Sequence, residues 1–245
     1  MIPAPAPTTA CERLLAYYPD GDGIRSRSVG GTVLSGTVPI PPLPRRLLAD
    51  WEGEMAEQLA LEPGDVESLN LPRARLRWPA YRQCVQAMDD WGQAIGLPDI
   101  LADGRIALMA CRGARYHLDA ELYGGAAFCN LFVSEDKGLD LHFPDAGHRI
   151  PLQRGTVVVF DTGQPHAVLQ RGRTGFVPQD YAAPRDCALV FLTWELPLER
   201  AELARALGIR FDVDAGTAAR LGEAQVWHQG SPADLCPESG RWRRR

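Results

Sequence analysis

The chain has 245 residues, of which 45% are hydrophobic and 23% are charged, a composition typical of a soluble globular protein. Its formal net charge of −5 does not favour nucleic acid or an anionic membrane as a partner. No apolar run approaches the roughly 18 residues that a membrane-spanning helix needs. The six cysteines form no CxxC pair, so we expect reduced thiols and a cytoplasmic protein.

Residues 1–104 are predicted to form an N-terminal arm and a helical support region. The proline-rich start is typical of a loose arm, and the Gly, Ser, Thr and Val residues of 22–40 favour one or two short strands. Apolar residues then recur at helical spacing in 45–62 and in 79–95, which predicts two helices. This region is expected to support the rest of the domain, and a homodimer contact through it is an open alternative.

Residues 105–196 are predicted to form a β core, because short β-type runs follow one another between Gly, Pro and Asp. Their close spacing leaves no room for crossover helices, so the sheets should be antiparallel. We therefore expect a mainly β fold with flanking helices and a jelly-roll core, as a single structural domain. The expected strands are Arg105–Arg112, Ala126–Val133, Leu139–Phe143, Gly155–Asp161, His166–Gln170 and Cys187–Glu195.

The remaining residues, 197–245, are predicted to be a helical tail, with one amphipathic helix at 198–207 and a second at 216–227. Within the core, the composition of Thr174–Pro184 is that of a loop, and its length suggests a lid or a rim.

His117-Leu118-Asp119, followed later by His166, offers two imidazoles and one carboxylate. This is the ligand set of the 2-His-1-carboxylate triad, which binds one face of a non-haem Fe(II) and leaves other positions open. If His117 and Asp119 lie on a strand, their spacing of two residues places both side chains on the same face. The alternative is a structural histidine beside a surface aspartate, because a chain with five histidines contains an HxD by chance fairly often.

The stretch from Gly113 to Glu195 resembles the Fe(II)/2-oxoglutarate-dependent dioxygenases, in particular the prolyl-hydroxylase-like branch. The resemblance covers about a third of the chain. Its most specific parts are the triad and the strand before the distal histidine. The matching segments are Gly113-x-x-x-His117-Leu118-Asp119, Gly138–Pro144, Arg154–Asp161, His166-Ala167-Val168 and Arg185–Phe191.

The resemblance implies a double-stranded β-helix as the catalytic core, with His117, Asp119 and His166 as both the catalytic and the metal-binding residues. The implied cofactors are Fe(II), 2-oxoglutarate as co-substrate and O2 as the second co-substrate. Because Asp119 is present, a halide has no vacant position, which points to hydroxylation and away from the halogenating members of the family.

The resemblance also implies an arginine that pairs with the far carboxylate of 2-oxoglutarate. Arg185 matches best in its strand context, although it lies further from His166 than usual and Cys187 stands where serine is common; Arg173 is the second candidate. Asn130 is either a co-substrate contact or a structurally hydrogen-bonded residue, and Val168 either packs on the co-substrate or belongs to the core. His142 points away from the apolar face of its strand, and a role in substrate contact is open.

These observations predict an oxygenase that hydroxylates an unactivated C–H bond of a small-molecule substrate, such as a free amino acid or a natural-product intermediate. One alternative is a peptidyl or protein hydroxylase of the same family. Two further alternatives are a cupin-like metal protein that needs no 2-oxoglutarate and a non-enzymatic β-sandwich binding module.

Overall fold

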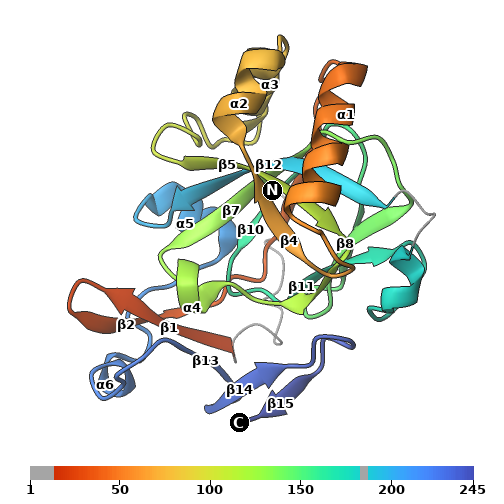
Figure 1. Ribbon diagram of the computed structural model, residues 1–245. Helices are drawn as coiled ribbons and strands as arrows, with labels where there is room; N and C mark the ends of the chain where they lie inside the picture. The colour runs from red at the N-terminus through yellow and green to blue at the C-terminus, as the bar shows by residue number, and fades with distance from the viewer. Residues whose placement is uncertain (1–13, 183–186) are drawn as a thin grey trace, which may run out of the picture.

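The structure, a computed structural model, describes residues 14–182 and 187–245, in which the strands form three antiparallel sheets (Figure 1). Two of the sheets contain the strands of the predicted core. The six-stranded sheet has the order β3 (Leu34–Thr37), β10 (Thr156–Asp161), β7 (Ala126–Phe132), β12 (Ala188–Pro197), β5 (Arg105–Arg112) and β4 (Val66–Leu69). The four-stranded sheet has the order β6 (Ala114–His117), β11 (His166–Gln170), β8 (Leu139–Phe143) and β9 (His148–Pro151).

The connectivity of the eight strands from β5 to β12 defines the fold. Strands β5, β7, β10 and β12 lie in the larger sheet, whereas β6, β8, β9 and β11 lie in the smaller one. The chain therefore passes repeatedly from one sheet to the other and forms a double-stranded β-helix, or jelly roll. The predicted fold class, mainly β with flanking helices and this core, is confirmed.

Apolar side chains fill the space between the two core sheets. The alternation of a strand sends every second residue inward, and on β12 these residues begin with Leu189 and Phe191. They pack against Phe132, Phe143 and Phe160 from the other strands. The opposite face of β12 carries Leu192, Trp194 and Leu196, which belong to a second apolar cluster. Both faces of the larger sheet are therefore covered, as near-continuous apolar strands require.

The helices of residues 45–94 and the first helix after the barrel cover the outer face of the larger sheet, where their buried residues join the cluster around Leu192 and Trp194. Figure 1 shows α1, α2 and α3 together on one side of the barrel. The helices are α1 (Arg45–Gly53) with its π-helical continuation η2 (Glu54–Gln58), α2 (Leu71–Arg77), α3 (Tyr81–Ala94), α4 (Ala120–Tyr123), η3 (Pro178–Tyr181), α5 (Ala201–Leu207) and α6 (Ala215–Ala218). The helices predicted at 45–62 and 79–95 are confirmed as α1 with η2 and as α3.

The third sheet joins segments from opposite ends of the sequence. Its order is β15 (Trp242–Arg244), β14 (Ser231–Leu235), β13 (Gln225–His228), β1 (Leu14–Asp20) and β2 (Gly23–Ser28). In Figure 1 these strands lie across the barrel from α1, α2 and α3. The β1–β2 hairpin, which packs beneath the barrel next to α4, is important for the site described below.

The prediction of a purely helical tail at 197–245 was wrong in part. Helix α5 lies where a helix was expected, but the helix predicted at 216–227 ends at Ala218, and Gln225–His228 form a strand. That strand pairs with β1, and the Trp227 ring packs against Tyr17 at 5.2 Å between centroids. Pairing with a distant strand edge therefore overrides the local helical pattern.

The loop predicted as a lid is fixed against the barrel as far as it is described. The Tyr181 hydroxyl donates to the carbonyl of Val168 and accepts from the backbone N–H of Gln170, and its ring stacks on Phe176 at 5.0 Å. The five described cysteines (Cys84, Cys111, Cys129, Cys187 and Cys236) form no disulfide. Among the described residues, no helix has both the length and the apolar character needed to cross a membrane.

We expect Gly155→Ala to destabilise the fold, because Gly155 has a φ of +88° and an added Cβ would lie 2.2 Å from the carbonyl oxygen of Val38. Its N–H also bonds Phe132, so the backbone has little room to move. Gly172→Ala is the control, since φ is +84° there but no neighbour lies within 4 Å. Urea unfolding should give a loss of about 1–3 kcal/mol at Gly172 and a clearly larger loss at Gly155. Equal losses would contradict the close approach of β3 to β10.

Candidate metal centre

Strand pairing brings the two triad histidines together. His117 is the last residue of β6 and His166 the first residue of β11, and the two are direct cross-strand partners. Their ring centroids lie 4.2 Å apart. The proximity of the imidazoles therefore follows from the backbone register of two neighbouring strands.

Asp119 reaches the site by a different route from the one predicted. The strand ends at His117, and Asp119 stands before α4 with φ −113° and ψ 3°, so the two residues do not share one strand face. Its backbone N–H donates to the carbonyl oxygen of Thr162 at 2.7 Å, which ties it to the turn between β10 and β11. The carboxylate Oδ2 lies 3.8 Å from Nε2 of His117 and 3.7 Å from Nε2 of His166.

The distances and hydrogen bonds suit a metal ion. The three donor atoms lie within 4.8 Å of one another, as expected for ligands that each bind one ion at about 2 Å. The Nδ1 atom of His117 lies 2.7 Å from the carbonyl oxygen of Arg115, and that of His166 lies 3.0 Å from the carbonyl oxygen of Gln164. An Nδ1–H donated to a carbonyl leaves Nε2 as the metal-binding nitrogen of each ring.

The electrostatics of the triad also suit a cation. Burial lowers the pKa of His166 well below its usual range, and the like charge of His117 lowers it further, so this imidazole is neutral near pH 7. Burial raises the pKa of the Asp119 carboxyl, and His117 offsets this only in part. A divalent ion between the donors would compensate for the cost of burying this carboxylate. Two imidazoles and one carboxylate therefore fit the metal centre that the sequence suggests.

The triad opens into a cavity of about 240 Å³ between the two core sheets. This volume lies at the low end for a ligand pocket. Most of the wall is apolar, and five aromatic rings contribute to it: Tyr123, Phe128, Phe132, Phe160 and Phe191. Apart from the triad, polar side chains come from the inner face of the larger sheet, namely Asn130, Thr193 and Glu195.

The residues predicted to bind the co-substrate fall into three groups. Asn130 and Val168 line the cavity with the triad, and Oδ1 of Asn130 is buried without a hydrogen-bond partner in the described structure. Arg173 is not brought to the site: it is exposed and forms a two-pronged ion pair with Asp180, at 2.7 and 2.8 Å. Arg185 lies outside the described residues.

His142 lies on the other side of β8 from the cavity. Its neighbour Leu141 lines the cavity, whereas Nδ1 of His142 lies 2.6 Å from the hydroxyl of Tyr116. The orientation predicted from strand alternation is thus confirmed, and the structure does not bring His142 to the triad.

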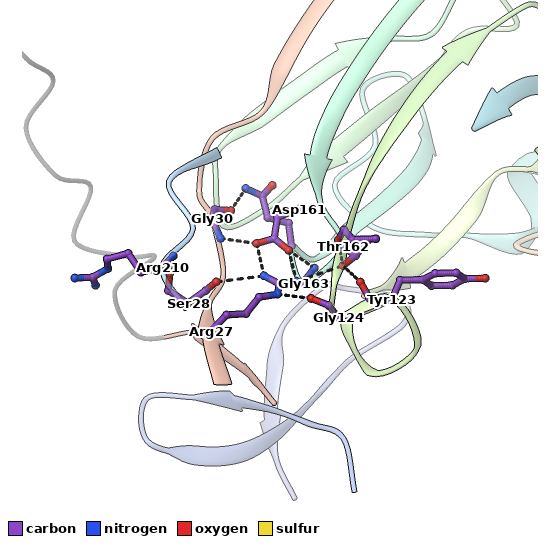
Figure 2. Close-up of polar contacts among 11 residues, drawn as sticks. Arg27, Ser28, Gly30, Tyr123, Gly124, Asp161, Thr162, Gly163 and Arg210 are labelled. Atoms are coloured by element: carbon purple, nitrogen blue, oxygen red, sulfur yellow. Dashed lines mark hydrogen bonds and ion pairs between the residues drawn. The ribbon is translucent and has the colours of Figure 1, made fainter. Parts of the chain in front are cut away.

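Beneath the triad lies a buried ion pair that sequence reasoning missed (Figure 2). The guanidinium of Arg27, on β2, donates to both carboxylate oxygens of Asp161, at the end of β10, with distances of 2.7 and 2.8 Å. Both side chains have an exposed fraction of 0%. The remaining hydrogen-bonding capacity is also used, because Arg27 Nε donates to the carbonyl of Gly124 and the N–H groups of Gly30 and Gly163 donate to Asp161.

This network continues into the triad. The Thr162 hydroxyl lies 2.9 Å from the carbonyl oxygens of both Tyr123 and Ala126, on either side of the α4–β7 connection, and can donate its one hydrogen to either. The Thr162 carbonyl accepts from Asp119, and two residues later the Gln164 carbonyl lies 3.0 Å from Nδ1 of His166. The ion pair therefore fixes the turn that orients two of the three triad residues. No local signal marks Arg27, whose alternation with Ser26 and Ser28 is typical of an exposed strand.

No protein-family model matches the sequence, and no curated protein matches it. Among solved structures, the chain is similar to a prolyl-4-hydroxylase of Pseudomonas putida, with 23% identity and a TM-score of 0.38 over 69% of this chain and 92% of that one. It is also similar to the collagen prolyl hydroxylase of Paramecium bursaria Chlorella virus-1 in complex with 2-oxoglutarate, with 9% identity and a TM-score of 0.38 over 66% and 94% of the two chains.

A third similar structure is SnoN, the non-haem α-ketoglutarate-dependent epimerase of nogalamycin biosynthesis, with 11% identity and a TM-score of 0.34 over 69% of this chain and 78% of that one. Because no TM-score reaches 0.5, the fold is defined by the strand order of this chain, and its activity has to be argued from its own residues.

We expect Arg27→Met to loosen the metal centre as well as the fold. The substitution leaves the Asp161 carboxylate buried and unpaired, which costs about 3–5 kcal/mol in urea unfolding. In the fraction that stays folded, the affinity for a divalent metal should fall about 10- to 100-fold, because the turn that holds Asp119 and His166 is released. Asp161→Asn, a milder change, should shift both quantities in the same direction.

The matched control is Arg25→Ala on the same strand. Arg25 forms an exposed ion pair with Asp212 at 2.8 Å, so its loss should cost less than about 1 kcal/mol and leave metal affinity unchanged. Unchanged metal affinity in Arg27→Met would mean that the ion pair stabilises the fold without orienting the triad.

Proposed function

We propose that the chain is an Fe(II)- and 2-oxoglutarate-dependent oxygenase that hydroxylates an unactivated C–H bond of a small molecule. The main support is the convergence of His117, Asp119 and His166 at the wall of a cavity inside a double-stranded β-helix. Bound Fe(II), with 2-oxoglutarate, supplies the activation of O2, coupled to oxidative decarboxylation of the co-substrate to succinate and CO2.

Each protein group has a defined part in this proposal. The Nε2 atoms of His117 and His166 and the Asp119 carboxylate would hold the metal, and the carbonyls of Arg115 and Gln164 keep the two rings in the required tautomer. Because the carboxylate occupies one ligand position, hydroxylation is favoured over halogenation. The apolar wall excludes water, which protects a reactive site from side reactions.

Binding of 2-oxoglutarate needs further groups beside the metal. The Asn130 amide can donate to a co-substrate carboxylate, and Val168 offers an apolar contact in the same cavity. No arginine or lysine lines the cavity in the described part of the chain, so the charge that pairs with the far carboxylate is assigned to Arg185. The small cavity favours a small molecule over a peptide, whose backbone would have to lie outside it.

Anaerobic addition of Fe(II) and 2-oxoglutarate should give a weak visible charge-transfer band, and candidate substrates in air should stimulate succinate release. His117→Ala and Asp119→Ala should abolish both signals and leave the circular dichroism spectrum unchanged. A cupin-like metal protein would bind the metal but show no band that depends on 2-oxoglutarate, and a binding module would do neither. Turnover retained in either variant would refute the triad assignment.

Arg185→Ala should raise the KM for 2-oxoglutarate by about 10- to 100-fold, as expected for the loss of a charge-assisted hydrogen-bonded pair. Arg173→Ala should leave this KM nearly unchanged, because its guanidinium already pairs with Asp180 at the surface. Steady-state kinetics of the two purified variants provide the comparison. The opposite ranking would transfer the role to Arg173.

A further inference from the structure

One wall of the candidate active-site cavity carries a carboxylate that the proposed oxygen chemistry does not use. Glu195 lies on β12 and lines the cavity together with Thr193. Within the described structure, the Glu195 carboxylate forms no hydrogen bond and no ion pair. Glu195 is partly exposed and faces the cavity, so a ligand with a positively charged group can serve as the partner of its carboxylate.

The neighbours of Glu195 in the sheet do not neutralise it. On β5 the residue directly opposite is Arg105, which is exposed and forms no ion pair with Glu195 in the described part of the chain. On β7 the residue directly opposite is Phe128, which offers an aromatic ring. Among the described residues, this negative charge therefore has no hydrogen-bonded partner, and it lies at a place that a ligand can reach.

Two polar side chains extend the acceptor surface beside Glu195. Asn130 on β7 and Thr193 on β12 are direct cross-strand partners, and both line the cavity. Asn130 is only 7% exposed, and its Oδ1 has no hydrogen-bond partner in the described structure. A buried amide oxygen without a partner costs free energy, which an incoming N–H group would recover. The Oδ1 atom of Asn130 can accept a hydrogen bond from such an N–H group while the NH2 group of the same amide donates to the co-substrate.

Aromatic rings in contact with one another lie between the triad and Glu195. The His166 ring lies 4.8 Å from the Phe160 ring, and Phe160 lies 6.0 Å from Phe128, the cross-strand partner of Glu195. Glu195 and the triad therefore face the same cavity, with apolar rings between them. A ligand suited to this wall has a positive N–H-bearing group for Glu195 and an apolar body for the rings.

We propose that Glu195, with Asn130 and Thr193, binds the ammonium or guanidinium group of a small cationic substrate and so holds its apolar part against the metal centre. This inference rests on the proposed function for the reaction that follows. It adds a substrate class, namely small molecules with a positively charged nitrogen group next to a C–H-bearing apolar segment. Glu195 acts here as a specificity-determining residue.

The test is ligand binding to the metal-free protein, which does not depend on turnover. The probes are 2-phenylethylammonium, the neutral 2-phenylethanol and the anionic 3-phenylpropanoate, measured by isothermal titration calorimetry at constant ionic strength. The native protein should bind the ammonium probe most tightly. Glu195→Gln, which keeps the shape of the side chain, should weaken that binding about 10- to 100-fold and leave 2-phenylethanol unchanged. Thermal melting of each variant checks that the fold is retained.

Two further variants show where the cation binds. Glu199→Gln removes the same charge from an exposed position just after β12 and should change no affinity. Asp119→Asn tests the other carboxylate of the cavity, so a loss of ammonium binding in this variant alone would overturn the proposal. Equal affinities for 2-phenylethylammonium and 2-phenylethanol in the native protein, or native affinity in Glu195→Gln, would also overturn it.

The outcomes separate this inference from the proposed function. Ammonium binding that depends on Glu195, without any 2-oxoglutarate turnover, would support the cation site and contradict the oxygenase. With turnover established, a panel of amines and their neutral isosteres should give substrate-dependent succinate release from the amines only. In that assay Glu195→Lys should remove the stimulation by amines and leave the anaerobic band with Fe(II) and 2-oxoglutarate in place. Stimulation by the neutral isosteres alone would overturn the assigned substrate class.

Discussion

The buried ion pair between Arg27 and Asp161 is the constraint on which the geometry of the metal centre depends. A charge removed from water is tolerated only when its hydrogen-bonding capacity is satisfied, and here backbone groups of Gly30, Gly124 and Gly163 complete the arrangement. These groups belong to the N-terminal hairpin, the α4–β7 connection and the β10–β11 turn. The ion pair therefore fixes the positions of these three segments relative to one another, which the barrel strands alone would not do. Such a pair contributes as much to uniqueness of structure as to stability.

The triad residues are positioned by two kinds of structure: the histidines lie on strands, whereas Asp119 lies in a connection between elements. His117 and His166 are brought together by strand pairing, and the carbonyls of Arg115 and Gln164 orient their rings. Asp119 lies beyond the strand, where its N–H donates to the Thr162 carbonyl and its own carbonyl accepts from the N–H groups of Leu122 and Tyr123. The precision of the site is therefore limited by its one non-strand ligand, and the buried network is concentrated on the turn that holds this ligand.

Local patterns in the sequence were enough to predict six of the eight strands from β5 to β12 and the helices α1 and α3, because each of these leaves a periodic signal; the short strands β6 and β9 were not predicted. The pairing of strands in the third sheet leaves no such signal, because β1 pairs with a strand some two hundred residues later in the sequence. The burial of Arg27 could not be predicted for the same reason, because it depends on the ion pair with the distant residue Asp161. The inward direction of Glu195 could be read from alternation with Phe191, but the sequence does not show that Arg105, the residue opposite it on β5, forms no ion pair with it in the described structure.

The sheet that joins the two ends of the sequence has a consequence for the order of assembly during synthesis. A nascent chain that has emerged as far as β12 contains the whole triad and every strand of the barrel. The hairpin that carries Arg27 is still without β13, its partner along β1. Contacts between such distant segments close late. The geometry of the triad, which depends on that hairpin, is therefore expected to become complete only after the barrel around it has formed.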